Sequence, residues 1–300
     1  MCGIAGYLDR GGGAGGAVGR TVLDMLEALA CRGPDSTGVA LFGAPQSGRL
    51  LVRVKAGEHG AADCTARIAA AAQRFGATDL TQNGAFLRFA IRETTELPAF
   101  LAEVEAVGRE VEVVSLGRRL EIVKQVGSPR NLESAFCVSG VHGSHGLGHT
   151  RLSTESIVDI SHSQPFWSHG YPDLAIVHNG HITNYHQLRR QYEQHGTRFY
   201  TENDSEVIAI YLAQKLRQGP GLEGAFHGML ADLDGSFSCL AATETEFGFV
   251  KDPFSFKPLV FTASDKFVAV ATEEIAIRAA LPGSYKVREA QAREVRVWRR

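Results

Sequence analysis

The sequence lacks any apolar run of the roughly 18–20 residues that a membrane-spanning helix needs. It also lacks a basic N-terminal segment followed by an apolar stretch, so its beginning does not resemble a signal peptide. Neither charge is in excess, because 31 Lys and Arg accompany 33 Asp and Glu, for a formal net charge of −2. These absences argue against a membrane protein and against binding of nucleic acid through a global basic field.

Cysteine is scarce and scattered. The five cysteines are odd in number and include no Cys-x-x-Cys pair, which argues against a disulfide framework and against a structural zinc site. We therefore predict a reducing, cytoplasmic location. Cys31, Cys64, Cys137 and Cys239 are interpreted as small buried apolar residues. Cys2 needs a separate explanation because of its position.

The hydrophobic pattern predicts one domain over residues 2–300, in which sheets are covered by helices. Residues 60–130 differ from the rest and predict a small α+β insertion within that domain. The main strands are expected at residues 2–8, 36–42, 49–57, 135–141, 147–152, 174–178, 236–243, 246–251, 259–263, 267–272 and 294–298, and the main helices at 22–30, 184–195, 204–217 and 274–279. The insertion is expected to contain helices at 61–75 and 97–107 and strands at 85–92, 110–115 and 119–125.

Cys2 follows the initiator methionine directly and precedes a glycine. Removal of Met1 would leave a thiol beside a free α-amino group, whose reference pKa lies near 7.7–8.0. Such an amine can act as the general base for its own thiol, an established arrangement for covalent catalysis. Position alone favours a small buried residue in an edge strand, so the case for a nucleophile depends on other segments.

Further segments contain residue types suited to binding an amino acid. Arg151 ends a predicted strand, and its planar guanidinium fits a carboxylate through two hydrogen bonds. Asn179 and Gly180 follow another strand, where they form either an ordinary turn or a pair of N–H donors for a developing oxyanion. Asp204 precedes a helix, where it could cap the helix and also bind an ammonium group. Residues 32–38 on their own indicate a turn.

Taken together, these segments resemble class II glutamine amidotransferases. Five motifs occur in the order typical of that family: Met1-Cys2-Gly3-Ile4, Arg32-Gly33-Pro34-Asp35-Ser36, Gly148-His149-Thr150-Arg151, His178-Asn179-Gly180-x-Ile182-x-Asn184 and Asp204-Ser205-Glu206-Val207. Each motif is weak to moderate alone, but five in the right order make chance agreement improbable. The resemblance implies an α+β fold of the N-terminal-nucleophile hydrolase type, a four-layer αββα sandwich.

The resemblance also implies roles for the reacting groups. Cys2 would be the nucleophile, with its own α-amine as the general base. Asn179 and Gly180 would form the oxyanion hole, and Arg32 would support the terminal strand. Such chemistry needs no cofactor and no metal, so we predict none, even though His142, His145 and His149 lie close together in the sequence.

Substrate binding is implied by position in the same way. Arg151 and Thr154 would bind the α-carboxylate side of L-glutamine, and Asp204 would bind its α-amino group. The chain departs from many sugar-phosphate amidotransferases after the arginine, where it has Leu152 and then Thr154-Glu155 in place of Trp and Thr-His. The position that usually holds His before Arg-Gly is Cys31.

The family resemblance favours a glutaminase subunit that supplies ammonia to a separate synthase. No acceptor region follows in the sequence, and the layout resembles the subunits related to glutamate synthase, including N-methylglutamate synthase systems. A flavin or iron–sulfur subunit would fit as the partner. Two alternatives stay open at this point: an amidohydrolase acting on γ-glutamyl compounds, and a non-catalytic subunit that binds glutamine and regulates a partner.

Overall fold

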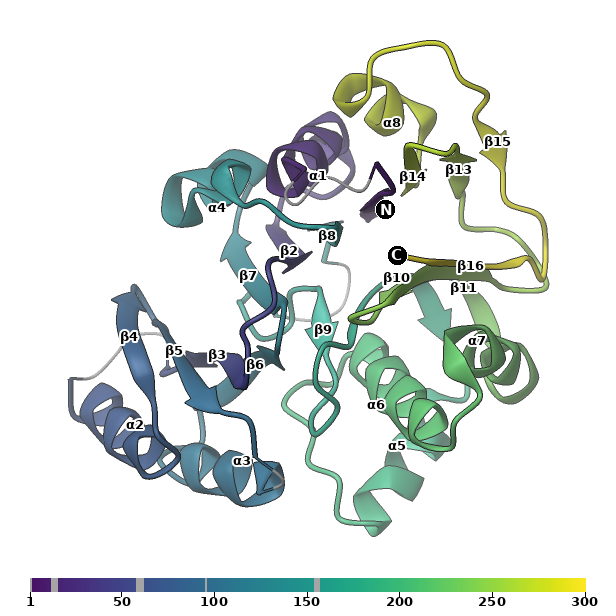
Figure 1. Cartoon of the computed structure of the whole chain (residues 1–300). Coiled ribbons are helices and arrows are strands. Elements are labelled where there is room, and N and C mark those ends of the chain that lie inside the picture. The colour runs from purple at the N-terminus through teal and green to yellow at the C-terminus, as the bar shows by residue number, and fades with distance from the viewer. Residues whose placement is uncertain (1, 12–15, 58–61, 95, 154–156) are drawn as a thin grey trace.

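Two antiparallel sheets lie face to face in the structure, a computed structural model that describes residues 2–11, 16–57, 62–94, 96–153 and 157–300. Helices cover the outer face of each sheet, so that Figure 1 shows α1, α4 and α8 on one side of the molecule and α5, α6 and α7 on the opposite side. This is the predicted αββα sandwich of mixed α and β elements, and the fold prediction is confirmed.

The first sheet has seven strands, and its centre carries the N-terminal strand. The strands in spatial order are β15 (Arg288–Glu289), β13 (Val260–Ala263), β14 (Phe267–Ala271), β1 (Gly3–Asp9), β8 (His145–Arg151), β2 (Ser36–Phe42) and β7 (Leu120–Val126). β1 pairs with β8 on one side and with β14 on the other, with Gly3 opposite Thr150 and Ala5 opposite Ala271. Cys2 therefore emerges from the middle of this sheet.

The second sheet has five strands in the order β16 (Val295–Arg299), β12 (Glu246–Lys251), β11 (Gly235–Ala242), β10 (Ala175–Ile182) and β9 (Phe166–Trp167). β10 pairs with β11 along its whole length, whereas β9 covers only Ala175 and Ile176 of its other edge. Most of that edge of β10 is consequently left without a neighbouring strand.

Apolar side chains fill all three spaces between the four layers. Ile4, Leu147 and Val177 belong to the core between the two sheets. Helices α1 (Val18–Ala28), α4 (Pro129–Phe136) and α8 (Glu274–Ala280) pack on the first sheet. Helices α5 (Tyr185–Gln194), α6 (Asp204–Arg217) and α7 (Gly221–Asp232) lie on the second. Strands thus bury both faces, as their apolar composition requires.

A third, four-stranded sheet forms a separate layer with two helices. Its order is β4 (Thr78–Asn83), β5 (Phe86–Arg92), β3 (Arg49–Lys55) and β6 (Glu112–Gly117), and it is accompanied by α2 (Ala62–Arg74) and α3 (Leu97–Glu105). The expected insertion at residues 60–130 overlaps this layer, whose sheet runs from residue 49 to residue 117. Strand β7, which was expected inside the insertion, pairs with β2 of the first sheet instead.

Three local predictions were wrong. Residues 135–141 were expected to form a strand, but they contain the end of α4 and a 3-10 turn at Val138–Gly140. Helix α7 and strand β4 were not predicted, because the glycines of α7 and the polar sequence of β4 hide their periodicity. Cys31 and Cys137 are exposed rather than buried, since both lie in turns that follow helices.

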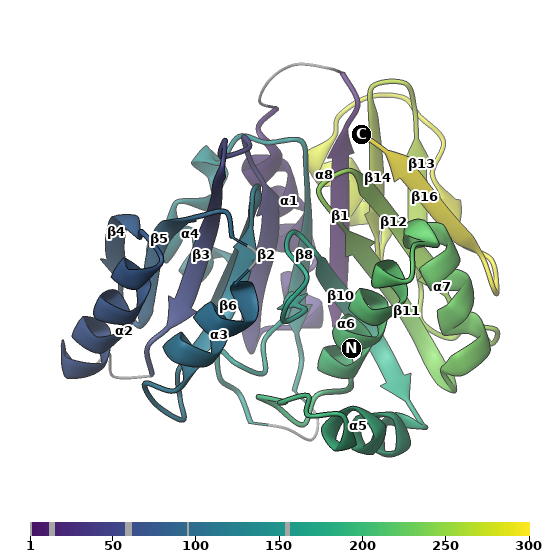
Figure 2. The same ribbon diagram turned by 60° about the horizontal axis from the view of Figure 1, so that its bottom comes forward.

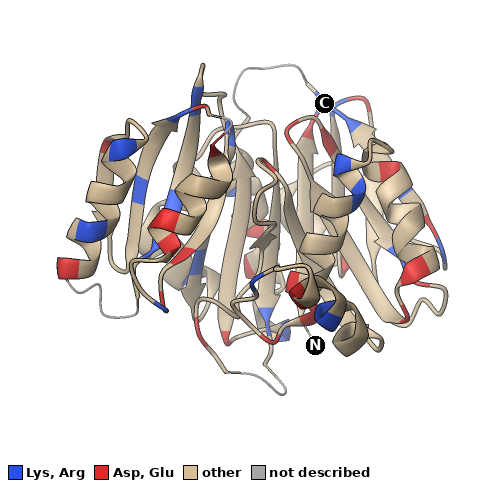
Figure 3. Ribbon diagram, turned by 90° about the horizontal axis from the view of Figure 1, so that it is seen from below, with Lys and Arg blue, Asp and Glu red and all other residues tan. Residues whose placement is uncertain are grey.

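The described surface carries both charges. Figure 3 shows Lys and Arg interspersed with Asp and Glu over the helices and strands in that view, in line with the nearly balanced composition. Within the described residues, no helix has both the length and the apolar character needed to cross a membrane.

Candidate active site

A cavity of about 180 Å³ lies where the ends of β1, β8 and β10 meet the start of α6. Figure 2 shows that β1 and β8 belong to one sheet and β10 to the other, so that the cavity takes residues from both. Five residues predicted from the sequence line it: Cys2, Arg151, Asn179, Gly180 and Asp204. Residues more than 200 positions apart in the chain are thus brought together as the motifs implied.

Cys2 is fixed at the entrance to β1 by contacts to its main chain. Its carbonyl oxygen accepts hydrogen bonds from Asn179 Nδ2 at 3.2 Å and from Arg32 Nε at 3.3 Å. The Arg32 guanidinium also makes a close ion pair with Glu273, next to the start of α8. The Cys2 Sγ lies 3.7 Å from the carbonyl oxygen of Leu152. Arg32 therefore contacts the end of the terminal strand, the place where a supporting role was predicted.

Arg151 ends β8 and forms part of the cavity wall. Its side chain is buried and donates a hydrogen bond from one terminal nitrogen to the carbonyl oxygen of Ile157 at 3.0 Å. Burial lowers the pKa of the Arg151 guanidinium, while the nearby Cys2 and Asp159 act in the opposite direction. An arginine remains cationic in proteins, so this wall carries a positive charge. Thr154, the second predicted carboxylate-binding residue, lies outside the described residues.

The open edge of β10 directs three backbone amides away from β11. The His178 N–H donates to Gln164 Oε1 at 2.6 Å, and the Ile182 N–H donates to Asp204 Oδ2 at 3.0 Å. Residues two apart in an antiparallel strand direct their amides to the same side. The amide of Gly180, between these two, therefore also faces the open edge, where the cavity lies.

Only glycine suits position 180. Its φ is +144°, and a Cβ atom there would lie 2.1 Å from the carbonyl oxygen of Ser236 on β11. This conformation allows the strand to approach β11 closely while it presents Asn179 and the Gly180 amide to the cavity. The side-chain N–H of one residue and the main-chain N–H of the next thus lie on the same cavity wall.

Asp204 is the first residue of α6 but does not cap the helix. The cap is Asn203, whose side-chain oxygen accepts a hydrogen bond from the Ser205 amide at 3.1 Å, so a capping role for Asp204 is ruled out in this structure. The Asp204 carboxylate instead accepts from the Ile182 amide and lies 3.6 Å from His178 Nδ1. Its position at a helix N-terminus also stabilises its negative charge.

Eight further residues line the cavity that were not predicted as site residues, among them Gln164, His178, Ser205 and Lys257. Burial lowers the pKa of His178, and Asp204 counteracts this only partly. Ser205 and His178 sit inside recognised motifs, so the motif boundaries could have suggested them. Gln164 and Lys257 occur in loops without periodic pattern, and only the fold brings them to the site.

Two histidines of β8, His145 and His149, are buried between the two sheets, and His149 is the nearer of the two to Arg151 at the end of the strand. Burial, together with the charge of Arg151, lowers the pKa of His149 to about 3. Burial lowers the pKa of His145 to about 4. Both rings are therefore neutral near pH 7. In the described part of the chain, no three His, Cys, Asp or Glu side chains are arranged to hold a metal ion.

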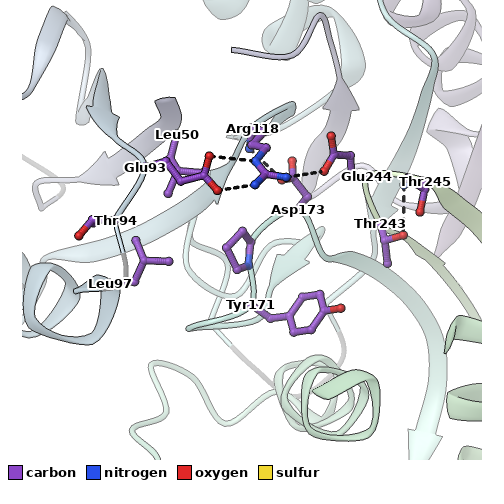
Figure 4. A pocket seen from close by; sticks show the side chains of 11 residues that line it. Leu50, Glu93, Thr94, Leu97, Arg118, Tyr171, Asp173, Thr243, Glu244 and Thr245 are labelled. Atoms are coloured by element: carbon purple, nitrogen blue, oxygen red, sulfur yellow. Dashed lines mark hydrogen bonds and ion pairs between the residues drawn. The ribbon is translucent and has the colours of Figure 1, made fainter. Parts of the chain in front are cut away.

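A second cavity, of about 370 Å³, lies between the four-stranded sheet and the main body. Figure 4 shows Arg118 at its centre, held between Glu93 and Glu244. The carboxylate of Asp173 accepts backbone hydrogen bonds from the turn that contains Arg118, the nearest at 2.8 Å. Its charged groups are thus paired with one another, and its lining includes no cysteine. This cavity lies between two layers of the fold, and its lining contains no reactive side chain.

Comparison with known proteins first identifies the fold. The solved structure of glutamine phosphoribosylpyrophosphate amidotransferase from B. subtilis aligns with 99% of this chain and 49% of its own, with a TM-score of 0.60 and 20% sequence identity. This similarity shows that the chain has the fold of the N-terminal-nucleophile amidotransferases.

Sequence matches identify the family. A glutamine amidotransferase domain profile matches residues 149–279. The chain is 35% identical over 283 residues to the glutamine amidotransferase-like protein GlxB of Rhizobium meliloti, which covers 91% of this chain and 89% of that protein. It is 34% identical over 307 residues to a provisionally named glutamine amidotransferase of Methanothermobacter thermautotrophicus, with 99% of both covered. The chain belongs to the class II glutamine amidotransferase family.

Proposed function

We propose that this protein hydrolyses the side-chain amide of L-glutamine with Cys2 as the nucleophile and passes the ammonia to a separate synthase subunit. The observation that carries the proposal is the content of a single cavity of about 180 Å³. It combines a terminal thiol, a guanidinium, a carboxylate and two N–H donors, contributed by Cys2, Arg151, Asp204, Asn179 and Gly180. These groups match the parts of a free glutamine molecule one by one.

Binding of the amino-acid end uses the two charged walls. The α-carboxylate of glutamine pairs with the Arg151 guanidinium, with which a carboxylate can form two parallel hydrogen bonds. The α-ammonium group pairs with the carboxylate of Asp204. Both protein charges come from segments with fixed main chains, since Arg151 ends a central strand and Asp204 begins a helix. This arrangement orients the side-chain amide toward Cys2.

The reaction then proceeds at the sulfur of Cys2. After removal of Met1, the α-amine of Cys2 takes the thiol proton, and the sulfur forms a bond to the amide carbon. The carbonyl electron pair moves to oxygen, where Asn179 Nδ2 and the Gly180 amide donate hydrogen bonds. The C–N bond breaks and ammonia leaves with the proton from the amine, which produces a γ-glutamyl thioester. Water hydrolyses the thioester, giving glutamate and the free thiol.

The ammonia acceptor is inferred from chemistry and from the relatives. Hydrolysis of glutamine alone consumes an amide without a product other than glutamate and ammonia, so a synthase that uses the ammonia gives the reaction a purpose. An amidophosphoribosyltransferase of M. thermautotrophicus is 33% identical over 179 residues, which are 59% of this chain but 36% of that protein. In that relative the matched region is joined to further chain.

Ammonia release from L-glutamine by the purified protein tests the proposal. We expect Cys2→Ala to abolish release, because no other thiol lines the described cavity. Cys64→Ala is the matched control, since Cys64 lies on α2 far from this cavity and its loss is expected to leave the rate unchanged. Undiminished release by Cys2→Ala, or intact-mass data showing Met1 retained on the active protein, would contradict the mechanism.

A further inference from the structure

Strand β9 flanks β10 on the edge opposite β11, but β9 does not extend along β10 as far as the candidate active site. β9 pairs only with Ala175 and Ile176, and the chain before it passes through Pro165, which has no amide hydrogen. We propose that the carboxamide of Gln164 replaces this missing strand at His178, and that Gln164 is a positioning residue for the oxyanion hole. The inference rests on the proposed glutaminase function and adds a residue to it.

The side chain of Gln164 makes the hydrogen bonds to β10 that the main chain of a neighbouring strand would otherwise make. Its Oε1 accepts the His178 N–H at 2.6 Å, and its Nε2 donates to the His178 carbonyl oxygen at 2.9 Å. A residue in an antiparallel strand would make the same pair of bonds with its main chain. His178 is immediately followed by Asn179, so these two bonds fix the main chain that carries the oxyanion donors.

Gln164 also joins β10 to α6. Its Nε2 lies 3.1 Å from Ser205 Oγ, which in turn lies 3.0 Å from His178 Nδ1. Ser205 immediately follows Asp204 in the chain. One buried carboxamide therefore bonds both to the strand that carries the oxyanion donors and to the first turn of α6, while Asp204 itself is held by the Ile182 amide.

The main chain of Gln164 is itself held in place. A Cβ atom at Gly38 on β2 would lie 2.2 Å from the Gln164 carbonyl oxygen, so the loop packs directly on the first sheet. Gln164 thus contacts a strand of the first sheet with its main chain and a strand of the second with its side chain. Because Cys2 directly precedes β1 of the first sheet and Asn179 belongs to the second, Gln164 connects the nucleophile side of the site to the oxyanion side.

Loss of a side chain with this role is expected to destabilise the tetrahedral oxyanion state more than the complex with bound substrate. Loss of the carboxamide leaves Arg151 and Asp204 in the cavity, so glutamine still binds. It releases the main chain that presents Asn179 and Gly180, so the oxyanion is less well stabilised. We expect kcat to fall by about 10-fold or more while KM changes by less than about threefold, since loss of oxyanion donors acts mainly on kcat.

The experiment uses the full chain and the Gln164→Met variant, in which a similar volume replaces the carboxamide without hydrogen-bonding groups. Inhibition is measured with two ligands: L-glutamate, which resembles the ground state, and the glutamine analogue with an aldehyde in place of the amide. The Cys2 sulfur adds to the aldehyde carbon, and the carbonyl electron pair moves to the oxygen. That adduct occupies the oxyanion hole, whereas glutamate does not require it.

We expect Gln164→Met to weaken aldehyde inhibition by about 10-fold or more and glutamate inhibition by less than about threefold. A purely structural role would reduce the fraction of active protein but leave both inhibition constants unchanged. Gln191→Met is the matched control, because Gln191 is exposed on α5. Gln164→Glu, which keeps an oxygen acceptor for the His178 amide, replaces Gln164→Met if that variant does not fold.

The outcomes separate the two proposals. If the wild-type protein neither hydrolyses glutamine nor binds the aldehyde, the proposed function fails and the role of Gln164 fails with it. If the wild-type protein does both, and Gln164 variants keep their kcat and their affinity for the aldehyde, only the positioning role is overturned. A parallel loss of affinity for glutamate and aldehyde would also overturn it, because the defect would then lie in substrate binding.

Discussion

Acid is expected to weaken the contact between the two sheets through His145. This histidine lies on β8 of the first sheet, and its Nε2 is 2.8 Å from the carbonyl oxygen of Thr243, at the end of β11 in the second. Its Nδ1 is 2.9 Å from Ser144 Oγ, and its ring stacks on Phe42 at 4.1 Å between centroids. The neutral ring satisfies both contacts without a buried charge, so protonation disfavours the folded state.

The direction and size of the effect follow from the pKa values. Burial lowers the pKa of His145 to about 4, below the 6.5 of an unperturbed histidine. Between these values the unfolded chain binds more protons than the folded chain, so stability is fully present above pH 6.5 and is lost as the pH falls toward 4. At pH 5 the unfolded histidine is almost wholly protonated and the folded one mostly neutral. His145 alone then costs about 2 kcal/mol relative to pH 8.

Urea unfolding at pH 8 and pH 5 measures this cost. The wild-type protein loses stability from several groups, since His149 and His178 also have lowered pKa values through burial. The difference between wild type and His145→Gln isolates one of them, and the variant is expected to lose about 2 kcal/mol less. His227→Gln, at an exposed position of α7, is the control and should behave like wild type. Equal losses in wild type and His145→Gln would refute the reasoning.

Two substitutions test the substrate and oxyanion walls. Asp204→Asn keeps an oxygen for the Ile182 amide but removes the charge, so steady-state kinetics should show KM for glutamine about 10- to 100-fold higher with a smaller change in kcat; an unchanged KM would exclude Asp204 from ammonium binding. Gly180→Ala forces a methyl group to within 2.1 Å of a carbonyl oxygen of β11 at a φ of +144°, so thermal unfolding should begin earlier and glutaminase activity should be lost. Gly196→Ala is the control, because Gly196 also has a positive φ, +82°, but has open space around it, so this variant shows the effect of backbone strain without a clash. An equal effect of the two variants would argue against the clash.

The sequence predicted the candidate catalytic and substrate-binding groups more completely than it predicted the residues that surround them. Cys2, Arg151, Asn179, Gly180 and Asp204 all line one cavity. Cys2, Arg151 and Asp204 lie at or next to the start or end of regular elements whose periodicity is readable, whereas Asn179 and Gly180 lie within β10, which continues to Ile182 past the predicted strand end at residue 178. The fold class was accessible for the same reason, since alternating strands and amphipathic helices specify sheets covered by helices. Motif order then selected one arrangement among several that such elements allow.

What the sequence could not predict depends on contacts between distant segments. The carboxamide of Gln164 acts as a strand partner only because β9 ends early and the loop packs on β2, and no local pattern encodes either fact. The sequence allowed Asp204 to cap α6, whereas Asn203 performs this role, because adjacent Asn and Asp are equally good caps in sequence. The tertiary bond of Asp204 to Ile182 decides between them.

The position of β1 explains how a chain terminus can serve as a catalytic group. Terminal residues are usually frayed, and a frayed thiol and amine would lose the fixed geometry that proton transfer needs. Here the residue after Cys2 is already paired in a central strand, with Gly3 opposite Thr150. The carbonyl of Cys2 accepts hydrogen bonds from Arg32, in the 3-10 turn that follows α1, and from Asn179 on β10 of the second sheet. In the proposed mechanism, removal of Met1 makes Cys2 the first residue, and these contacts constrain its main chain as firmly as that of an internal residue while they leave its α-amine free.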